Sequence, residues 1–222
     1  MPRSARIFQR ALCYHVMNRG VNRQRIFQDD ADRRYFTQTV ADYKALCGAR
    51  IYHWCWMDNH YHVLIEVVYE NLRGFAGGLQ QAFAQYHHAR HHGSGVFWQG
   101  RFKSRPVEIG SYLASCGRYI ERNPVRAGLA VHAWDYHWSS ASSYVNGVED
   151  GLTDENPYLG AFEEADRHAY AQALISGESD EAVIRQVEGE RVIGSRAFAE
   201  TLKMERGRHR VKRGRPYVKC VN

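Results

Sequence analysis

Residues 54–66 read Trp-Cys-Trp-Met-Asp-Asn-His-Tyr-His-Val-Leu-Ile-Glu, and this stretch decides the predicted fold. Tryptophan, tyrosine, valine and isoleucine are typical of β-strands, and the Asp58-Asn59 pair is typical of a turn. We therefore expect a strand over residues 50–57, a tight turn, and a second strand over residues 60–68.

His60 and His62 lie one pleat apart in the second of these strands. Side chains of a strand alternate between its two faces, so both imidazoles point to the same side. The other side carries apolar residues, Tyr61, Val63, Ile65 and Val67, as a core-facing side does. Two imidazoles held on a rigid strand can bind one divalent metal ion, although such pairs also occur as ordinary core or surface histidines.

Hydrophobic periodicity predicts the other elements on either side of these strands. We expect a first strand at 12–17, helices at 30–46, 71–92 and 109–123, and a short strand within 97–107. The order β-α-β-β-α-β-α is typical of an α+β fold with a ferredoxin-like or RRM-like antiparallel sheet and helices on one face. Further short helices are predicted around 161–175, 180–188 and 194–204.

The composition is that of a folded globular protein. The chain has 222 residues, of which 44% are hydrophobic, and no run of eighteen apolar residues that could span a membrane. Its five cysteines are scattered without a Cys-x-x-Cys pair, which argues against a disulfide framework and a zinc ribbon. No secretion signal is recognised at the start, so we expect a cytoplasmic protein.

Charge divides the chain into three parts. Residues 1–148 hold 18 Lys and Arg against 10 Asp and Glu, residues 149–190 hold 2 against 12, and residues 191–222 hold 10 against 2. The basic parts suggest a polyanionic partner, with the acidic part turned away from it or competing with it. One hypothesis is that the acidic part shields a basic groove and restrains activity.

These patterns predict three units. Residues 1–145 form the α+β domain, and 146–205 form an acidic, mostly helical extension. Residues 206–222 are too polar to be buried and are predicted to form a basic, flexible DNA-binding tail.

The predicted helix 109–123 carries a stripe of side chains along one face, including Tyr112, Tyr119 and Asn123, that can support chemistry. Pro124 favours a helix end near Asn123, so that Tyr119 and Asn123 project together from the last turn. A phenol can attack phosphorus when a metal ion polarises the phosphate, and an amide oxygen can join a metal site of mixed nitrogen and oxygen ligands. Tyr112 is a competing nucleophile on the same stripe, and simple packing of the stripe against the sheet is another interpretation.

Five segments resemble one protein family. Residues 55–65 resemble the metal-binding strand of the single-tyrosine transposases, whose fold is of the HUH endonuclease type. Residues 119–129 resemble the nucleophile helix of one branch, the REP-associated tyrosine transposases. The other three segments that match this branch are 18–27, 97–104 and 138–140.

The resemblance implies a metal-dependent enzyme that cuts and rejoins single-stranded DNA. It implies Tyr119 as the nucleophile that forms a 5′-phosphotyrosine, and His60, His62 and Asn123 as ligands of Mg²⁺ or Mn²⁺. The implied substrates are REP-like hairpins flanked by a GTAG-like tetranucleotide. It further implies a monomer or homodimer that works at the nucleoid.

Basic and polar residues of the matching segments and the tail are candidates for DNA contacts, which provide affinity rather than sequence choice. They are Arg19, Asn22, Arg23, Arg101, Lys103, Arg105, Arg122, Arg126, Arg213 and Arg215. Residues 212–216 also resemble the core of an AT-hook, and a plain basic tail is equally consistent with them. The family pattern often has proline where this chain has Asp58, and Val21 stands at a position that is usually uncharged.

Some alternatives remain open. Four histidines, His87, His88, His91 and His92, make two i, i+4 pairs that could bind a metal, but we expect no carboxylate to orient them. We interpret them as a solvated helix end or a phosphate contact. Glu66 shares the histidine face and is a candidate for an outer partner of the histidines or a distant metal ligand. The whole chain could also be a non-catalytic RRM-like binder of repeats, or a nuclease that uses water instead of Tyr119.

Overall fold

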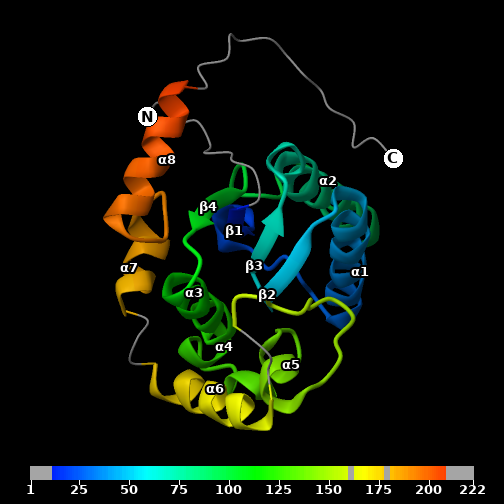
Figure 1. Ribbon diagram of the computed structural model, residues 1–222. Helices are drawn as coiled ribbons and strands as arrows, with labels where there is room; N and C mark the ends of the chain where they lie inside the picture. The colour runs from blue at the N-terminus through cyan, green and yellow to red at the C-terminus, as the bar shows by residue number, and fades with distance from the viewer. Residues whose placement is uncertain (1–11, 160–162, 178–180, 209–222) are drawn as a thin grey trace.

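The computed structural model describes residues 12–159, 163–177 and 181–208, and Figure 1 shows how they are arranged. Four strands form one sheet in the order β2-β3-β1-β4 with every neighbouring pair antiparallel. The strands are β1 (Leu12–Arg19), β2 (Arg50–Met57), β3 (His60–Val67) and β4 (Lys103–Val107). This order confirms the predicted ferredoxin-like sheet. The fourth strand begins later than the predicted segment, since only a single bridge from Gly20 to Trp98 precedes it.

Helices α1 (Asp30–Cys47) and α2 (Leu72–His91) cover one face of the sheet. The Asp29 side chain caps α1 by accepting a hydrogen bond from the Asp32 backbone amide at 3.1 Å. Gly48 ends the helix in the left-handed conformation with φ of 58°, as its sequence position suggested. Aromatic rings fill the space between these helices and the sheet, among them Phe27, Phe36, Phe75, Phe83, Trp56 and Tyr61.

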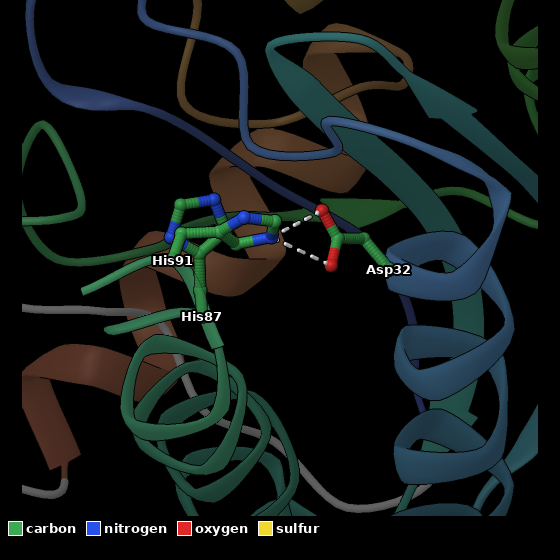
Figure 2. Close-up of side chains that lie close together, drawn as sticks. All are labelled: Asp32, His87 and His91. Atoms are coloured by element: carbon green, nitrogen blue, oxygen red, sulfur yellow. Dashed lines mark hydrogen bonds and ion pairs between the residues drawn. The ribbon is translucent and has the colours of Figure 1, made fainter. Parts of the chain in front are cut away.

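The two helices pack closely because Gly78 leaves room for the Tyr43 ring. A Cβ atom at residue 78 would stand 2.2 Å from that ring. At one end of the pair, the Asp32 carboxylate at the start of α1 meets His91 near the end of α2, as Figure 2 shows.

The other face of the sheet is covered as well, so the expectation of helices on one face only was wrong. Helix α3 (Ser111–Glu121) lies across this face, followed by the single turn α4 (Asn123–Arg126). The sequence pattern missed this because α3 comes after the last strand and a strand pattern does not reveal which face a later helix covers. Gly117 lets α3 approach β2, since a Cβ atom there would lie 2.5 Å from His53 Nε2.

The chain after α4 packs back onto this body. It forms α5 (Ala141–Asn146), α6 (Glu164–Ser176), α7 (Glu181–Gly189) and α8 (Arg196–Arg208), which match the three predicted late helices within a few residues and add α5. Short 3-10 turns lie at Val21–Arg23, Tyr69–Asn71 and Ala133–Asp135. The three-unit division stays a prediction, and the predicted tail beyond residue 208 lies outside the described residues.

Candidate active site

His60 and His62 share one face of β3, with their ring centroids 4.9 Å apart. His60 Nδ1 is 2.6 Å from Asn59 Oδ1, and His62 Nδ1 is 2.8 Å from His15 Nε2. Both interactions use Nδ1, which leaves Nε2 of each ring as the atom that can hold a metal ion. Metal-binding histidines commonly engage their other ring nitrogen in this way, because that partner fixes the tautomer and the ring orientation. The pair therefore fits a divalent metal ion.

His15 is a member of the site that the sequence analysis missed. It lies on the central strand β1, is fully buried, and stacks on His62 with centroids 5.1 Å apart. The available signal was a lone histidine inside an otherwise apolar strand. Nothing in the sequence paired that strand with His62, and only the strand register brings the two rings together.

Burial keeps these histidines in the neutral form that binds metal. It lowers the pKa of His60 to about 4, with a further contribution from the neighbouring Arg19 guanidinium. It lowers the pKa of His15 to about 3 and that of His62 well below its ordinary value. A neutral imidazole keeps one ring nitrogen unprotonated, and that nitrogen can bind a cation without first losing a proton.

Tyr119 of α3 lies against the histidines. Its ring is edge-on to His62 at 5.8 Å and to His15 at 6.1 Å, and the Arg126 guanidinium lies 5.1 Å from its centroid. The side chain is 6% exposed. Tyr112 lies two turns earlier, partly buried at the edge of the same apolar cluster. Tyr119 therefore has ring contacts with His62 and His15, whereas Tyr112 packs at the edge of the cluster.

Asn123 follows one turn after Tyr119. Its side-chain amide donates to the carbonyl oxygens of Tyr119 at 2.8 Å and Ile120 at 3.1 Å. These bonds point its NH₂ group back into α3, and its Oδ1 atom is the one that could bind a cation. The helix ends just before Pro124, as expected: α3 finishes at Glu121, and the separate turn α4 starts at Asn123 with proline in its first turn. Whether Asn123 is the third ligand stays a prediction.

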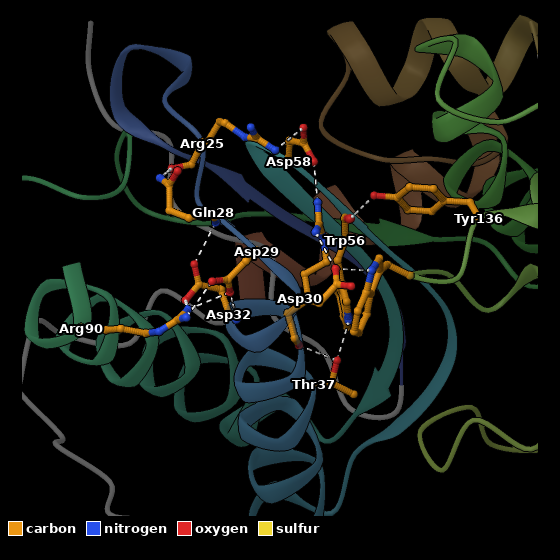
Figure 3. Close-up of polar contacts among 12 residues, drawn as sticks. Arg25, Gln28, Asp29, Asp30, Asp32, Thr37, Trp56, Asp58, Arg90 and Tyr136 are labelled. Atoms are coloured by element: carbon orange, nitrogen blue, oxygen red, sulfur yellow. Dashed lines mark hydrogen bonds and ion pairs between the residues drawn. The ribbon is translucent and has the colours of Figure 1, made fainter.

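The turn before His60 is held by the loop that follows β1. The Asp58 carboxylate pairs with Arg25, as Figure 3 shows, and also with Arg33. The Asp58 carbonyl oxygen accepts the Ile26 amide at 2.7 Å. The Gly20 amide also donates to the Asn59 carbonyl oxygen at 2.9 Å. The segment 18–27 therefore has a structural reason to accompany the histidine strand, and Asp58 takes part in it.

The other two short segments also frame this region. The Val21 amide donates to the Phe97 carbonyl oxygen and the Gln99 amide to that of Arg19, each at 2.9 Å, so that segment 97–104 lies against the loop. On the far side, the Trp138–Ser140 segment adds to the edge of β2 through the Trp56 and Ser140 amides.

The sheet register places two predicted DNA-contacting residues beside the histidines. Arg19 stands opposite His60, and Met17 stands between His62 and Lys103. Residues directly opposite on neighbouring strands share a face, so Arg19 and Lys103 lie on the histidine face.

The remaining candidates differ in exposure. Arg105 on β4 is 8% exposed, and its Nε donates to the Glu190 carbonyl oxygen at 2.7 Å. Arg122 is half-buried, and the exposed ones are Asn22, Arg23, Arg101, Lys103 and Arg126. Asn22 and Arg23 have positive φ of 52° and 60° in the loop after β1. Arg213 and Arg215 lie outside the described residues. DNA contact by any of these residues stays a prediction.

Glu66 is not adjacent to the His60–His62 pair. It lies four residues beyond His62, roughly 13 Å along the strand, and accepts a hydrogen bond from Tyr52. A second tyrosine, Tyr158, donates to it at 3.4 Å. These contacts give Glu66 a packing role at the other end of β3.

The comparisons with known proteins assign the chain to a family. Residues 8–123 match the family model described as IS200-like transposase. The chain belongs to the IS200-like transposase family. It is therefore a transposase, a protein that binds DNA and cuts and joins it, and this family uses a divalent metal ion. No curated protein matches the chain.

Eight chains of solved structures match this transposase. One is a REP-associated tyrosine transposase bound to a REP hairpin, with a TM-score of 0.54 and 15% identity over 69% of this chain and 89% of that one. This likeness supports the fold. Another is a candidate transposase from Deinococcus radiodurans R1, with a TM-score of 0.38 and 16% identity over 58% of this chain and 92% of that one.

Within the described residues, no helix has both the length and the apolar character needed to cross a membrane.

Proposed function

We propose that this transposase cuts and rejoins single-stranded DNA through a covalent bond to Tyr119, and that its substrates are REP-type hairpins. The observation that carries the proposal is the edge-on contact of the Tyr119 ring with His62, which puts a phenol next to a neutral imidazole pair. A tyrosine that only packed α3 against the sheet would not require contact with these imidazoles.

The proposed reaction needs no nucleotide cofactor. Tyr119 Oη bonds to the scissile phosphorus, the bond from phosphorus to the 3′ oxygen breaks, and the phenolic proton ends on the departing 3′ hydroxyl. Mg²⁺ or Mn²⁺ held by His60, His62 and Asn123 would polarise the phosphate and stabilise its developing charge. Attack of a 3′ hydroxyl on the phosphotyrosine reverses the reaction and joins the strands.

The basic side chains on the same face would hold the DNA backbone. Arg19 and Lys103 flank the histidines on the sheet, and exposed Arg126 lies over the Tyr119 ring. Phosphate contacts of this kind provide salt-dependent affinity. The proposed hairpin preference rests on the resemblance of the five segments to the REP-associated branch. A protein that acts on such chromosomal repeats is expected to be associated with the nucleoid.

A denaturing-gel assay tests the proposal. The full chain is incubated with labelled single-stranded DNA from repeats beside its own gene, with Mg²⁺ or Mn²⁺. We expect a cut product and a slow-migrating adduct that protease removes. Both should disappear in Tyr119→Phe, whereas Tyr112→Phe, a matched change on the same helix, should keep them.

Each rival function gives a different gel. A nuclease that uses water would still cut in Tyr119→Phe and would form no adduct. A non-catalytic binder would shift the hairpin in a native gel without any cutting. If Tyr112→Phe, and not Tyr119→Phe, lost the adduct, the assignment of the nucleophile would be wrong.

A further inference from the structure

A second cluster of metal-binding groups lies on the opposite side of the sheet from the site described above. Asp32 of α1 and His87 and His91 of α2 each offer one ligand atom, and these atoms lie within 4.8 Å of one another. Figure 2 shows the His91 imidazole joined to the Asp32 carboxylate by dashed lines, with the His87 imidazole beside it. The carboxylate that the histidines lack in their own segment is thus supplied by a helix 55 residues earlier in the sequence.

His87 is the residue that packing alone does not explain. It is 9% exposed, and neither of its ring nitrogens has a hydrogen-bond partner among the residues that the structure describes. Its ring centroid lies 4.4 Å from that of His91 and 4.6 Å from that of Phe97. A buried imidazole without a partner is costly, and a metal ion bound to it would remove that cost.

Asp32 is prepared as a ligand. Its Oδ1 accepts a hydrogen bond from Arg90, while Oδ2 accepts the Gln28 amide at 2.8 Å, and both oxygens lie 3.0 Å from His91 Nε2. Burial opposes the charged form, but the hydrogen bonds from Gln28, His91 and Arg90 outweigh it, so the pKa of Asp32 is lowered. Outer hydrogen bonds of this kind orient a ligating carboxylate.

The charge around the cluster favours a cation. Arg90 pairs with both Asp29 and Asp32, so two carboxylates face one guanidinium, as Figure 3 shows. With neutral imidazoles the group keeps one net negative charge, which a divalent ion would more than offset.

We propose that Asp32, His87 and His91 bind a zinc ion that ties the start of α1 to the end of α2. Two imidazoles and one carboxylate are a common three-residue ligand set for Zn²⁺, with a water molecule in the fourth position, whereas Mg²⁺ prefers oxygen ligands. Ligand distances of about 2.0–2.2 Å require only modest rotations of the side chains from their present separation. This site is independent of the DNA chemistry on the other face.

Zinc binding by the full chain tests the proposal. Protein stripped with a chelator is titrated with Zn²⁺ against a chromophoric competitor. The His60→Gln/His62→Gln background removes the other imidazole pair from the count. We expect one Zn²⁺ per chain in this background. Adding His91→Gln should weaken Zn²⁺ binding by at least about 10–100-fold. That range is the usual loss when a residue that only hydrogen-bonds to a metal ligand is removed, and removing a ligand itself should cost no less.

His92→Asn is the matched control. His92 is an exposed imidazole at the same helix end with φ of 52°, a conformation that asparagine accepts. The His92→Asn variant should bind Zn²⁺ as tightly as the His60→Gln/His62→Gln protein from which it is made. No binding in the background, or equal losses in the two variants, would overturn the proposal.

A second measurement needs no substitution. Anomalous scattering at the zinc edge from crystals of the unmodified chain grown with Zn²⁺ should place a peak among Asp32, His87 and His91. Peaks confined to other places would overturn the proposal. Neither measurement involves DNA cleavage, so the proposed zinc site and the proposed function stand or fall separately.

Discussion

The two faces of the sheet have different interiors. The face under α1 and α2 is a cluster of aromatic and aliphatic side chains, and Phe36 alone contacts the rings of Phe27, Trp56, Tyr61 and Phe83. The face under α3 buries polar groups between apolar ones, including His15, His62, His53 and Glu121. Apolar burial dominates between the sheet and the helices α1 and α2, where the buried Asp32 and His87 lie at one end of the helix pair. The face under α3 instead buries polar groups against the sheet itself, and these groups need partners.

The first prediction tests the aromatic face. Phe36→Ala should lower the free energy of unfolding by about 3–5 kcal/mol, because it removes a fully buried ring and leaves a cavity among four others. The measurement is the midpoint of guanidinium unfolding. Tyr35→Ala, next to it but 40% exposed, should cost much less. Equal costs would mean that this face is not the main source of stability.

The second prediction tests the buried network on the α3 face. Glu121 Oε1 accepts from Ser140 at 2.6 Å and lies 2.9 Å from His53 Nδ1, and Oε2 accepts from Tyr170 of α6 at 2.8 Å. In Glu121→Gln an NH₂ group replaces one of these acceptors and faces a donor, so we expect a loss of about 1–3 kcal/mol in the free energy of unfolding.

Glu66→Gln is the control for this network. Glu66 lies on the same face, is only partly buried, and accepts from tyrosines near the edge of the sheet. It should cost less than Glu121→Gln in the same denaturant titration. A larger effect at Glu66 would show that the depth of burial does not decide the cost on this face.

The Glu121 network also bears on the acidic extension. Arg167 of α6 donates to the Ser143 and Tyr144 carbonyl oxygens, and Asp154 accepts from the Ile51 amide at 2.7 Å and pairs with Lys44. Deleting the chain after residue 146 would remove Tyr170 from Glu121 and expose the start of the β2 edge at Ile51, where Asp154 pairs with it. A truncation would therefore change stability as well as any restraint on cleavage, and charge-reversing substitutions on exposed acidic residues are the cleaner test of the hypothesis.

The sequence predicted what local patterns determine. Alternation placed His60 and His62 on one face, and helical spacing with Asp29 and Gly48 bounded α1 closely. What it could not predict depends on contacts between distant segments. His15 meets His62 only through the register of β1 on β3, Glu121 draws partners from three other segments, and Asp32 reaches His91 only because α1 and α2 pack together.

The last prediction concerns His15. Its Nε2 atom contacts His62 Nδ1 and so fixes the orientation and tautomer of the His62 ring. His15→Gln should therefore weaken Mn²⁺ binding at the His60–His62 pair by about 10–100-fold, the usual cost of removing a residue that hydrogen-bonds to a metal ligand. His53→Gln changes another fully buried histidine on the same face, whose partner is Glu121. It should lower stability and leave Mn²⁺ affinity unchanged. Metal titration followed by unfolding of the same samples separates the two effects. If both variants weakened Mn²⁺ binding equally, the loss would come from general loosening of this face, and His15 would have no special place beside His62.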